Sequence, residues 1–196
     1  MRMTRLVTVG VIAAAVFAAG CSSSDNKDSG STANNSSNTA AKSAPSNAFN
    51  QEVDNAIASF KSHDPSLSKF FDSCAGYAIF PSVAKGGLGV GAAHGDGQVF
   101  EGGARVGKAE LSQGSIGLQI GGQEYRELVF FKDKAALDSF KSDSFEFAGN
   151  ASAVAVKSGA ATAVDYSNGV AVFTITTAGL MLEASIGGQK FDYTAY

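Results

Sequence analysis

Few side chains in this sequence could serve as a nucleophile or as a base. The chain has two cysteines, Cys21 and Cys74, and two histidines, His63 and His94. A thiol nucleophile needs a base close to it, and no motif in the sequence brings Cys74 to either histidine. The carboxylates lie along strand-like runs, where solvated faces commonly carry them, as at Glu101, Glu110, Glu124 and Glu127. We therefore expect no catalytic residues and predict that the protein is not an enzyme.

Metal and phosphate sites lack support as well. His94 and Asp96 could supply two ligands, but a metal site of the zinc type needs three or four. The glycine-rich run 85–91 lacks the Gly-x-x-x-x-Gly-Lys-Ser/Thr pattern of a phosphate loop, and its glycines alternate as in a strand. We expect no metal and no cofactor. Alternate glycines on one strand face instead indicate close packing of another chain segment or of a ligand.

Cys21 follows a segment that reads as an export signal. Arg2 and Arg5 flank an apolar run at residues 6–17, which is too short to span a bilayer. The sequence Ala-Ala-Gly-Cys that ends at Cys21 resembles the lipobox of bacterial lipoproteins, which implies cleavage before the cysteine and acylation of its thiol and amino group. We expect residues 1–20 to be a signal peptide and acyl chains such as palmitate on Cys21 to form a covalent lipid anchor. The alternative is an ordinary secretory signal with an incidental cysteine.

The residues after Cys21 indicate a tether and a location. Residues 21–47 are rich in serine and nearly free of large apolar side chains, so they cannot bury enough surface to fold. We expect a disordered tether there and a folded domain over residues 48–196. Ser22 stands where an Asp usually signals retention in the inner membrane. The lipoprotein resemblance therefore implies attachment to the outer membrane, with the domain facing the periplasm.

The charge balance argues against nucleic acid. The chain has 15 Lys and Arg and 18 Asp and Glu, and loss of Arg2 and Arg5 with the signal leaves 13 basic residues. The longest basic cluster is 132–134. Nucleic-acid binders carry a basic surface, so we predict that this protein is not one of them.

Helical spacing of apolar residues opens the domain. The run from Phe49 to Phe60 predicts an amphipathic helix. Asp64 then predicts the cap of a second helix, with Pro65 at its first position and Cys74 on its buried face. A short third helix is predicted over residues 133–141.

Short β-prone runs separated by glycine fill the remainder. Gly95-Asp96-Gly97 and Ser167-Asn168-Gly169 predict hairpin turns, the second between strands at 163–166 and 170–176. A further strand is predicted at 124–131. Helices followed by strands, one helix and more strands indicate an α+β fold. We predict a mainly antiparallel β-sheet domain with two N-terminal helices and one short central helix.

The sequence Ile-Gly-Gly-Gln occurs twice, at 120–123 and at 186–189. Each copy follows a strand-like run. Two interpretations are open: related strand pairs that face each other, or a convenient way to bend one strand next to another.

Five blocks, in order, carry a family resemblance: 76–91, 114–122, 127–131, 145–156 and 169–187. Together they resemble the SYLF domain, also called the Ysc84 actin-binding domain, over residues 48–193. The resemblance implies lipid binding, since eukaryotic members bind phosphoinositides and some yeast members bind and bundle actin. Bacterial members are commonly secreted or lipoproteins, with phospholipid as the ligand. Actin does not carry over to a periplasmic lipoprotein.

Lipid recognition requires cations for the headgroup and exposed apolar groups for the acyl region. The resemblance directs attention to basic residues near the start of the domain, and a second group lies beside Phe130 and Phe131. The candidate lipid-binding residues are Lys61, Lys69 and Lys85 in the first group and Arg126, Lys132 and Lys134 in the second. We expect a non-catalytic domain that binds phospholipid at a membrane surface in the cell envelope. The alternative is a structural or protein-interaction module with an envelope protein as its partner.

Overall fold

The computed structural model describes residues 45–142, 145–147 and 153–196. The expected signal peptide 1–20, Cys21 and most of the tether 21–47 lie outside the described residues. In the described part, no helix combines the length and the apolar character needed to cross a membrane. Residues Ala41–Tyr196 form one compact unit. Both hydrophobic clusters described below come entirely from this unit, so it carries its own core.

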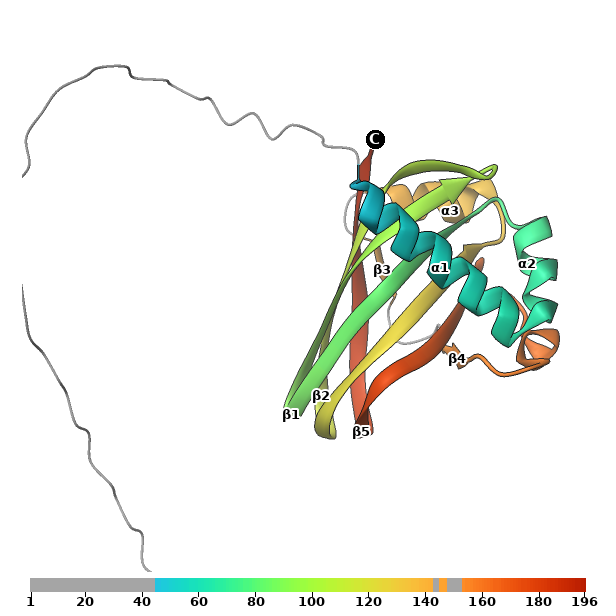
Figure 1. The fold of residues 1–196 in the computed structure, drawn as a ribbon. Helices are drawn as coiled ribbons and strands as arrows, with labels where there is room; N and C mark the ends of the chain where they lie inside the picture. Colours follow the sequence, from blue (N-terminus) through green and yellow to red (C-terminus); the bar gives the residue numbers. More distant parts are fainter. Residues whose placement is uncertain (1–44, 143–144, 148–152) are drawn as a thin grey trace, which may run out of the picture. The chain divides into compact units, whose positions relative to one another are not determined.

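The described residues form an α+β domain whose sheet is mainly antiparallel, as predicted (Figure 1). The sheet has five strands: four follow the order β1-β2-β5-β3, and the short β4 pairs with β5 in parallel. The elements, in chain order, are α1 Asn47–His63, η1 Pro65–Leu67, α2 Ser68–Ser73, β1 Gly76–Glu101, β2 Ala104–Phe131, α3 Lys134–Lys141, β3 Phe145–Phe147, β4 Val154–Ala155, η2 Ala160–Ala163 and β5 Val170–Ala195.

Local capping explains where the helices begin. The Ser46 side chain accepts a hydrogen bond from the Phe49 amide at 3.2 Å and starts α1. The Asp133 side chain caps α3 in the same way by accepting from the Ala136 amide, so the predicted helix 133–141 is confirmed with its first residue as the cap. Asp64 caps the segment after α1, but Pro65 starts a single turn of 3-10 helix before α2 follows.

The Asp64 carboxylate also joins two distant segments. It is buried and accepts hydrogen bonds from the amide and hydroxyl of Ser66 and from the amides of Gly159 and Ala161. Burial by itself would raise the pKa of Asp64, but these four hydrogen bonds stabilise the carboxylate and lower the pKa overall. Asp64 therefore connects the loop after α1 to η2, almost a hundred residues further along the chain.

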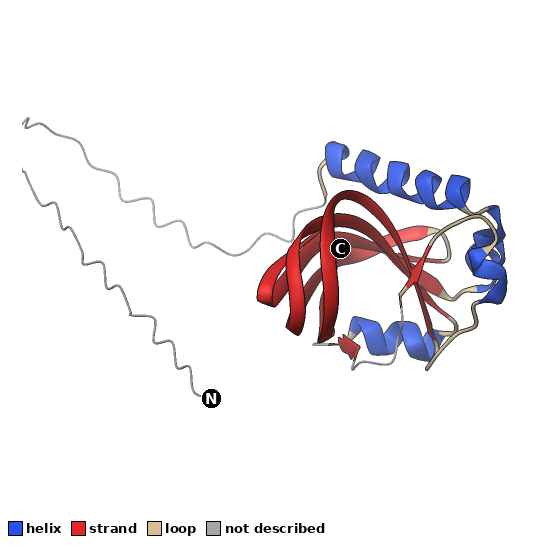
Figure 2. Cartoon of the chain, turned by 90° about the horizontal axis from the view of Figure 1, so that it is seen from below, coloured by secondary structure: helices blue, strands red, loops and turns tan. Residues whose placement is uncertain are grey.

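The three long strands bend, so that the two halves of the sheet face each other (Figure 2). The second half of β1 packs on its first half, because a Cβ atom on Gly97 would lie 2.6 Å from the Phe80 ring and one on Gly95 would lie 2.8 Å from Val83. The predicted hairpin turn at Gly95–Gly97 is therefore wrong. These glycines lie within β1 and allow its two halves to approach, while the chain turns at 102–103.

The second predicted turn is confirmed. Asn168 and Gly169 both have positive φ, 50° and 81°, and Ser167 bridges to Val170 across them. Residues 163–166 do not form the predicted strand, since Ala163 ends η2 instead. The predicted strands 124–131 and 170–176 are parts of β2 and β5.

Two hydrophobic clusters lie on the two faces of the curled sheet. The inner cluster lies between the halves and is closed by α3; it includes Ala78, Phe80, Val83, Val99, Leu111, Tyr125, Val129, Phe131, Leu137, Phe140, Val172 and Phe191. The outer cluster packs the first half of the sheet against α1, α2 and η2; it includes Val53, Ala56, Phe60, Leu67, Phe70, Ile79, Leu128, Phe130, Ala161, Phe173 and Ile175. Helices α1 and α2 therefore pack on the outer cluster, whereas α3 packs on the inner one.

Both Ile-Gly-Gly-Gln sequences lie beside the bend. Gly121 of the first copy is the register partner of Gly87 in β1, and Gly188 of the second is the partner of Gly114 in β2. The two copies do not pair with each other. This placement favours the interpretation that the sequence helps a strand to bend next to its neighbour.

An apolar tip as the candidate functional site

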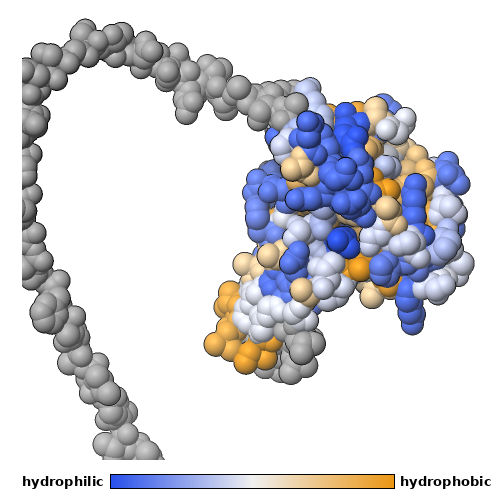
Figure 3. Space-filling view, in the orientation of Figure 1, coloured by the Kyte–Doolittle hydropathy of each residue, from blue (hydrophilic) through white to orange (hydrophobic). Residues whose placement is uncertain are grey.

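Four large aliphatic side chains are exposed where β1 and β2 bend. Leu88 is 77% exposed, Val90 67%, Ile116 73% and Ile120 57%. Leu88 is the register partner of Ile120, and Val90 is the partner of Ile116, so the four side chains are cross-strand neighbours. We call this group the apolar tip. Figure 3 shows it as an orange patch at the end of the sheet where Figure 1 places the bends.

Glycine allows β1 to bend at this point. A Cβ on Gly87 would lie 2.6 Å from both the Gly91 Cα and the Val90 carbonyl oxygen, and Gly89 has a φ of +74°. At Gly87 the bend therefore has no room for a side chain, whereas Leu88 and Val90 are exposed. The backbone of β5 follows the same course, with Ile186 in register with Ile116.

The apolar tip lies in a segment without charge. Neither 86–92 in β1 nor 114–123 in β2 contains Asp, Glu, Lys, Arg or His. Lys85 precedes the first segment and is half-buried. The surface around the tip therefore presents no cluster of cations from these two strands.

Behind the tip, Glu127 lies fully buried inside the curled sheet. Its Oε2 accepts a hydrogen bond of 2.9 Å from the Gln189 side chain of β5, while Oε1 has no hydrogen-bond partner among the described residues. Burial raises the pKa of Glu127 to about 7, although the Gln189 hydrogen bond and the Lys85 charge both lower it. The expectation that Glu127 lies on a solvated strand face is wrong, because both halves of the sheet enclose it.

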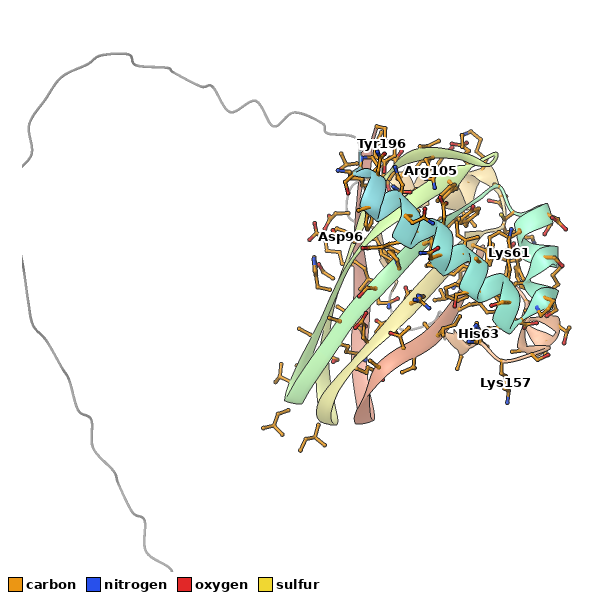
Figure 4. All side chains as sticks on the ribbon, in the orientation of Figure 1. Lys61, His63, Asp96, Arg105, Lys157 and Tyr196 are labelled. Carbon is orange, nitrogen blue, oxygen red and sulfur yellow. The ribbon has the colours of Figure 1, made fainter. Side chains whose placement is uncertain are left out.

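The first group of predicted lipid-binding residues lies apart from the tip, except for Lys85. The Lys61 ammonium lies 4.5 Å from the centre of the Phe71 ring. Lys69 donates to the carbonyl groups of Thr162 and Val164, both at 3.3 Å. Figure 4 shows Lys61 on the side of α1 and α2, away from the bend. Phe71 is half-buried, so Lys61 has no exposed ring beside it.

In the second group, Arg126 lies within β2, while Lys132 and Lys134 follow the end of this strand. Arg126 donates to the Ser59 hydroxyl at 3.1 Å. Lys134 forms ion pairs with Asp138 at 3.0 Å and Glu101 at 3.6 Å, and Lys132 is exposed. The structure does not bring the six predicted residues onto one surface. Lys85 lies near the bend, whereas Lys132 and Lys134 follow the end of β2, far from the bend.

Cys74 has no histidine beside it in the described structure. It lines a cavity of about 420 Å³ whose other lining residues are Lys61, Phe71, Asp72, Ala75, Gly76, Tyr77, Phe100, Gly102 and Gly103. Burial raises the pKa of the Cys74 thiol. His94 instead lies 3.7 Å from Glu110, and His63 contacts the Ser59 carbonyl oxygen. The described residues contain no group of three His, Cys, Asp or Glu side chains that could hold a metal ion.

Comparison with known proteins identifies the second part of the domain. The model of the Ysc84 family, described as "Las17-binding protein actin regulator", matches residues 112–194. Residues 112–194 are a Ysc84 domain. This confirms the SYLF resemblance, and the matched residues begin within β2 and end near the end of β5. It includes Ile116 and Ile120 of the apolar tip, while Leu88 and Val90 precede it.

A curated relative covers more of the chain. Beta cell expansion factor A of Aeromonas veronii is 31% identical over 147 residues, which are 74% of this chain and 55% of the relative. The chain therefore spans about half the length of the curated relative that it matches. This relative is also a bacterial protein of the SYLF family.

Proposed function

We propose that this chain is a membrane-anchored lipoprotein whose Ysc84 domain binds phospholipid and catalyses no reaction. Acyl chains on Cys21 would attach it to the outer membrane, and residues 21–47 would tether the domain on the periplasmic side. The tether would end where Ser46 caps α1, and as a flexible coil of about 25 residues it would span about 28 Å. That reach allows the domain to touch the membrane that holds its anchor.

The apolar tip is the observation that supports phospholipid binding. Isolated exposed hydrophobic residues are common on soluble domains, but neighbouring ones mark contact sites. Leu88, Val90, Ile116 and Ile120 are all more than half exposed and are adjacent across two paired strands. Transfer of such a side chain from water to an apolar phase is worth about 1.5–3 kcal/mol when burial is complete. Four of them can hold a domain at a membrane.

Co-sedimentation of the Ala41–Tyr196 unit with phospholipid vesicles tests this proposal. This unit lacks Cys21 and the export signal, so any binding comes from the domain itself. We expect the parent unit to sediment with the vesicles. The double substitution Leu88→Ser and Ile116→Ser should weaken partitioning by at least about tenfold, since each loss of about 1.4 kcal/mol is tenfold.

Tyr196→Ser provides the matched control. Tyr196 is the other exposed large hydrophobic residue among those described, at 39% exposure, and its loss should leave sedimentation unchanged. Failure of the parent unit to sediment with any vesicle would contradict the proposal. That result would instead favour a module that binds an envelope protein.

A further inference from the structure

We propose that the apolar tip recognises the acyl layer of an electrically neutral phospholipid surface and enters it end-on. This inference rests on the proposed function and adds the kind of surface that is bound and the orientation of the domain on it. It departs from the expectation that lysine and arginine side chains make the main contact with the lipid headgroup.

The charge distribution argues for a neutral surface. Each Lys or Arg held near an acidic membrane contributes about 1 kcal/mol of attraction. The bend segments 86–92 and 114–123 contain no such residue, and the equivalent segment of β5, 178–189, contains a single charged residue, which is an acid. The unit as a whole also has more acidic than basic residues. Binding through the tip therefore gains little from acidic lipid and should be insensitive to salt.

The path of the strands argues for end-on entry. Lys132 follows Ile120 by 12 residues along β2, which is roughly 40 Å of extended strand. Helices α1 and α2 pack on the outer cluster, and Figures 1 and 2 both place α2 away from the bend. When the tip contacts a membrane, Lys132 and α2 must therefore stand off from it.

The size of the tip argues for lipid over a second copy of the chain. Four aliphatic side chains expose roughly a few hundred Å², whereas each partner in a stable protein complex buries about 800 Å². The patch lies at the end of the sheet, where the strands bend (Figures 1 and 3). A bilayer can close around a small protruding group, whereas a second rigid copy would need a matching recess.

Single tryptophan residues can test both the depth and the charge dependence. The chain has no tryptophan, so Leu88→Trp and Lys132→Trp in the Ala41–Tyr196 unit each supply one reporter. The probes are vesicles of phosphatidylcholine brominated on its acyl chains, alone or mixed with phosphatidylglycerol, at low and at physiological salt. We expect the Leu88→Trp emission to shift to the blue and to be quenched by bromine. The Lys132→Trp emission should not change.

We expect similar partitioning, within about threefold, in all four conditions, because no cation of the bend segments contributes. Sedimentation of both variants with quenching only in Lys132→Trp would overturn the orientation while leaving phospholipid binding intact. Binding only to the phosphatidylglycerol mixture, with loss at physiological salt, would overturn the neutral target. A blue-shifted Leu88→Trp emission without lipid, together with a dimer in sedimentation velocity, would assign the tip to a second copy. No sedimentation with any vesicle would defeat the proposed function itself.

Discussion

The buried carboxyl group of Glu127 should make the stability of the domain depend on pH near neutrality. In an unfolded chain its pKa is the ordinary value of 4.5, whereas in the folded protein burial raises the pKa to about 7. The folded protein then holds this proton more tightly than the unfolded chain does. The free energy of unfolding therefore falls as the pH rises from about 4.5 to about 7, and it levels off above that.

The size of this effect follows from the two pKa values. Each unit of difference corresponds to about 1.4 kcal/mol, so the full loss is about 3 kcal/mol. Glu127→Gln keeps the shape of the side chain and an oxygen that can accept from Gln189, but it cannot ionise. We expect the variant to be more stable than the parent by about 2–3 kcal/mol above neutrality, and close to the parent at about pH 4.5.

Urea unfolding followed by far-ultraviolet circular dichroism over a pH series measures this difference. Other titrating groups are common to both proteins, so the difference between parent and variant isolates Glu127. Gln189→Leu is a second test: it removes the hydrogen bond that lowers the pKa of Glu127, and it should move the loss of stability to higher pH. Parallel stability curves for parent and Glu127→Gln from about pH 4.5 to about pH 8 would refute the reasoning.

Three further predictions concern the framework of the domain. Asp64→Ala leaves three backbone amides without their acceptor and should cost about 2–4 kcal/mol in urea unfolding; full parental stability would contradict the proposed connection to η2. Gly97→Ala places a Cβ against Phe80 and should cost about 1–3 kcal/mol, whereas Gly114→Ala, with open space around it, should change stability by less than about 1 kcal/mol. The Cys74 thiol, whose pKa is raised by burial, should react with an aromatic disulfide reagent at neutral pH at least about tenfold more slowly than in urea; equal rates would show an accessible thiolate.

The helices could be predicted because their signals are local. The Ser46 and Asp133 caps, the Asp64-Pro65 start and the apolar stripe of α1 all lie within a few residues of the structure that they specify. The turn at Asn168-Gly169 is local in the same sense. Its two residues adopt the positive φ values that this kind of turn requires.

The curled sheet could not be predicted in the same way. Gly95-Asp96-Gly97 has the composition of a turn, but its glycines serve a contact with residues that lie up to 18 positions earlier in the same strand. The alternation of side chains along a strand assigns residues to the two faces of the sheet, but it does not show which face is buried. In this sheet both faces of the first half are buried over much of their length, and Glu127 is therefore enclosed. Glu127 lies on the same strand face as Tyr125 and Val129, which are both buried in the inner cluster. A carboxylate between two such residues is the sequence signal that could have predicted its burial.

At the apolar tip, the bend of β1 was easier to predict from the sequence than the exposure of its side chains. Alternate glycines at Gly87, Gly89 and Gly91 did indicate an unusual strand, and the structure shows that β1 bends there. Leu88 and Val90 look like core residues in the sequence, because aliphatic side chains in strands are usually buried. They become exposed only because the bend lies at the far end of the sheet from the helices. Among the described residues, no helix covers them there.

The same geometry forces a choice between the two groups of candidate lipid contacts. The Lys61 ammonium group already contacts the Phe71 ring, and that of Lys69 contacts carbonyl groups at the end of η2. Binding a headgroup would require both to leave these partners. The four side chains of the apolar tip are exposed to water, so they would lose no comparable internal contact on binding. One rigid domain cannot present both groups to a flat membrane at once, because the strands separate them. The free energy of membrane binding therefore favours the apolar tip over the helices, because the tip gains from burial of its side chains without first losing an internal contact.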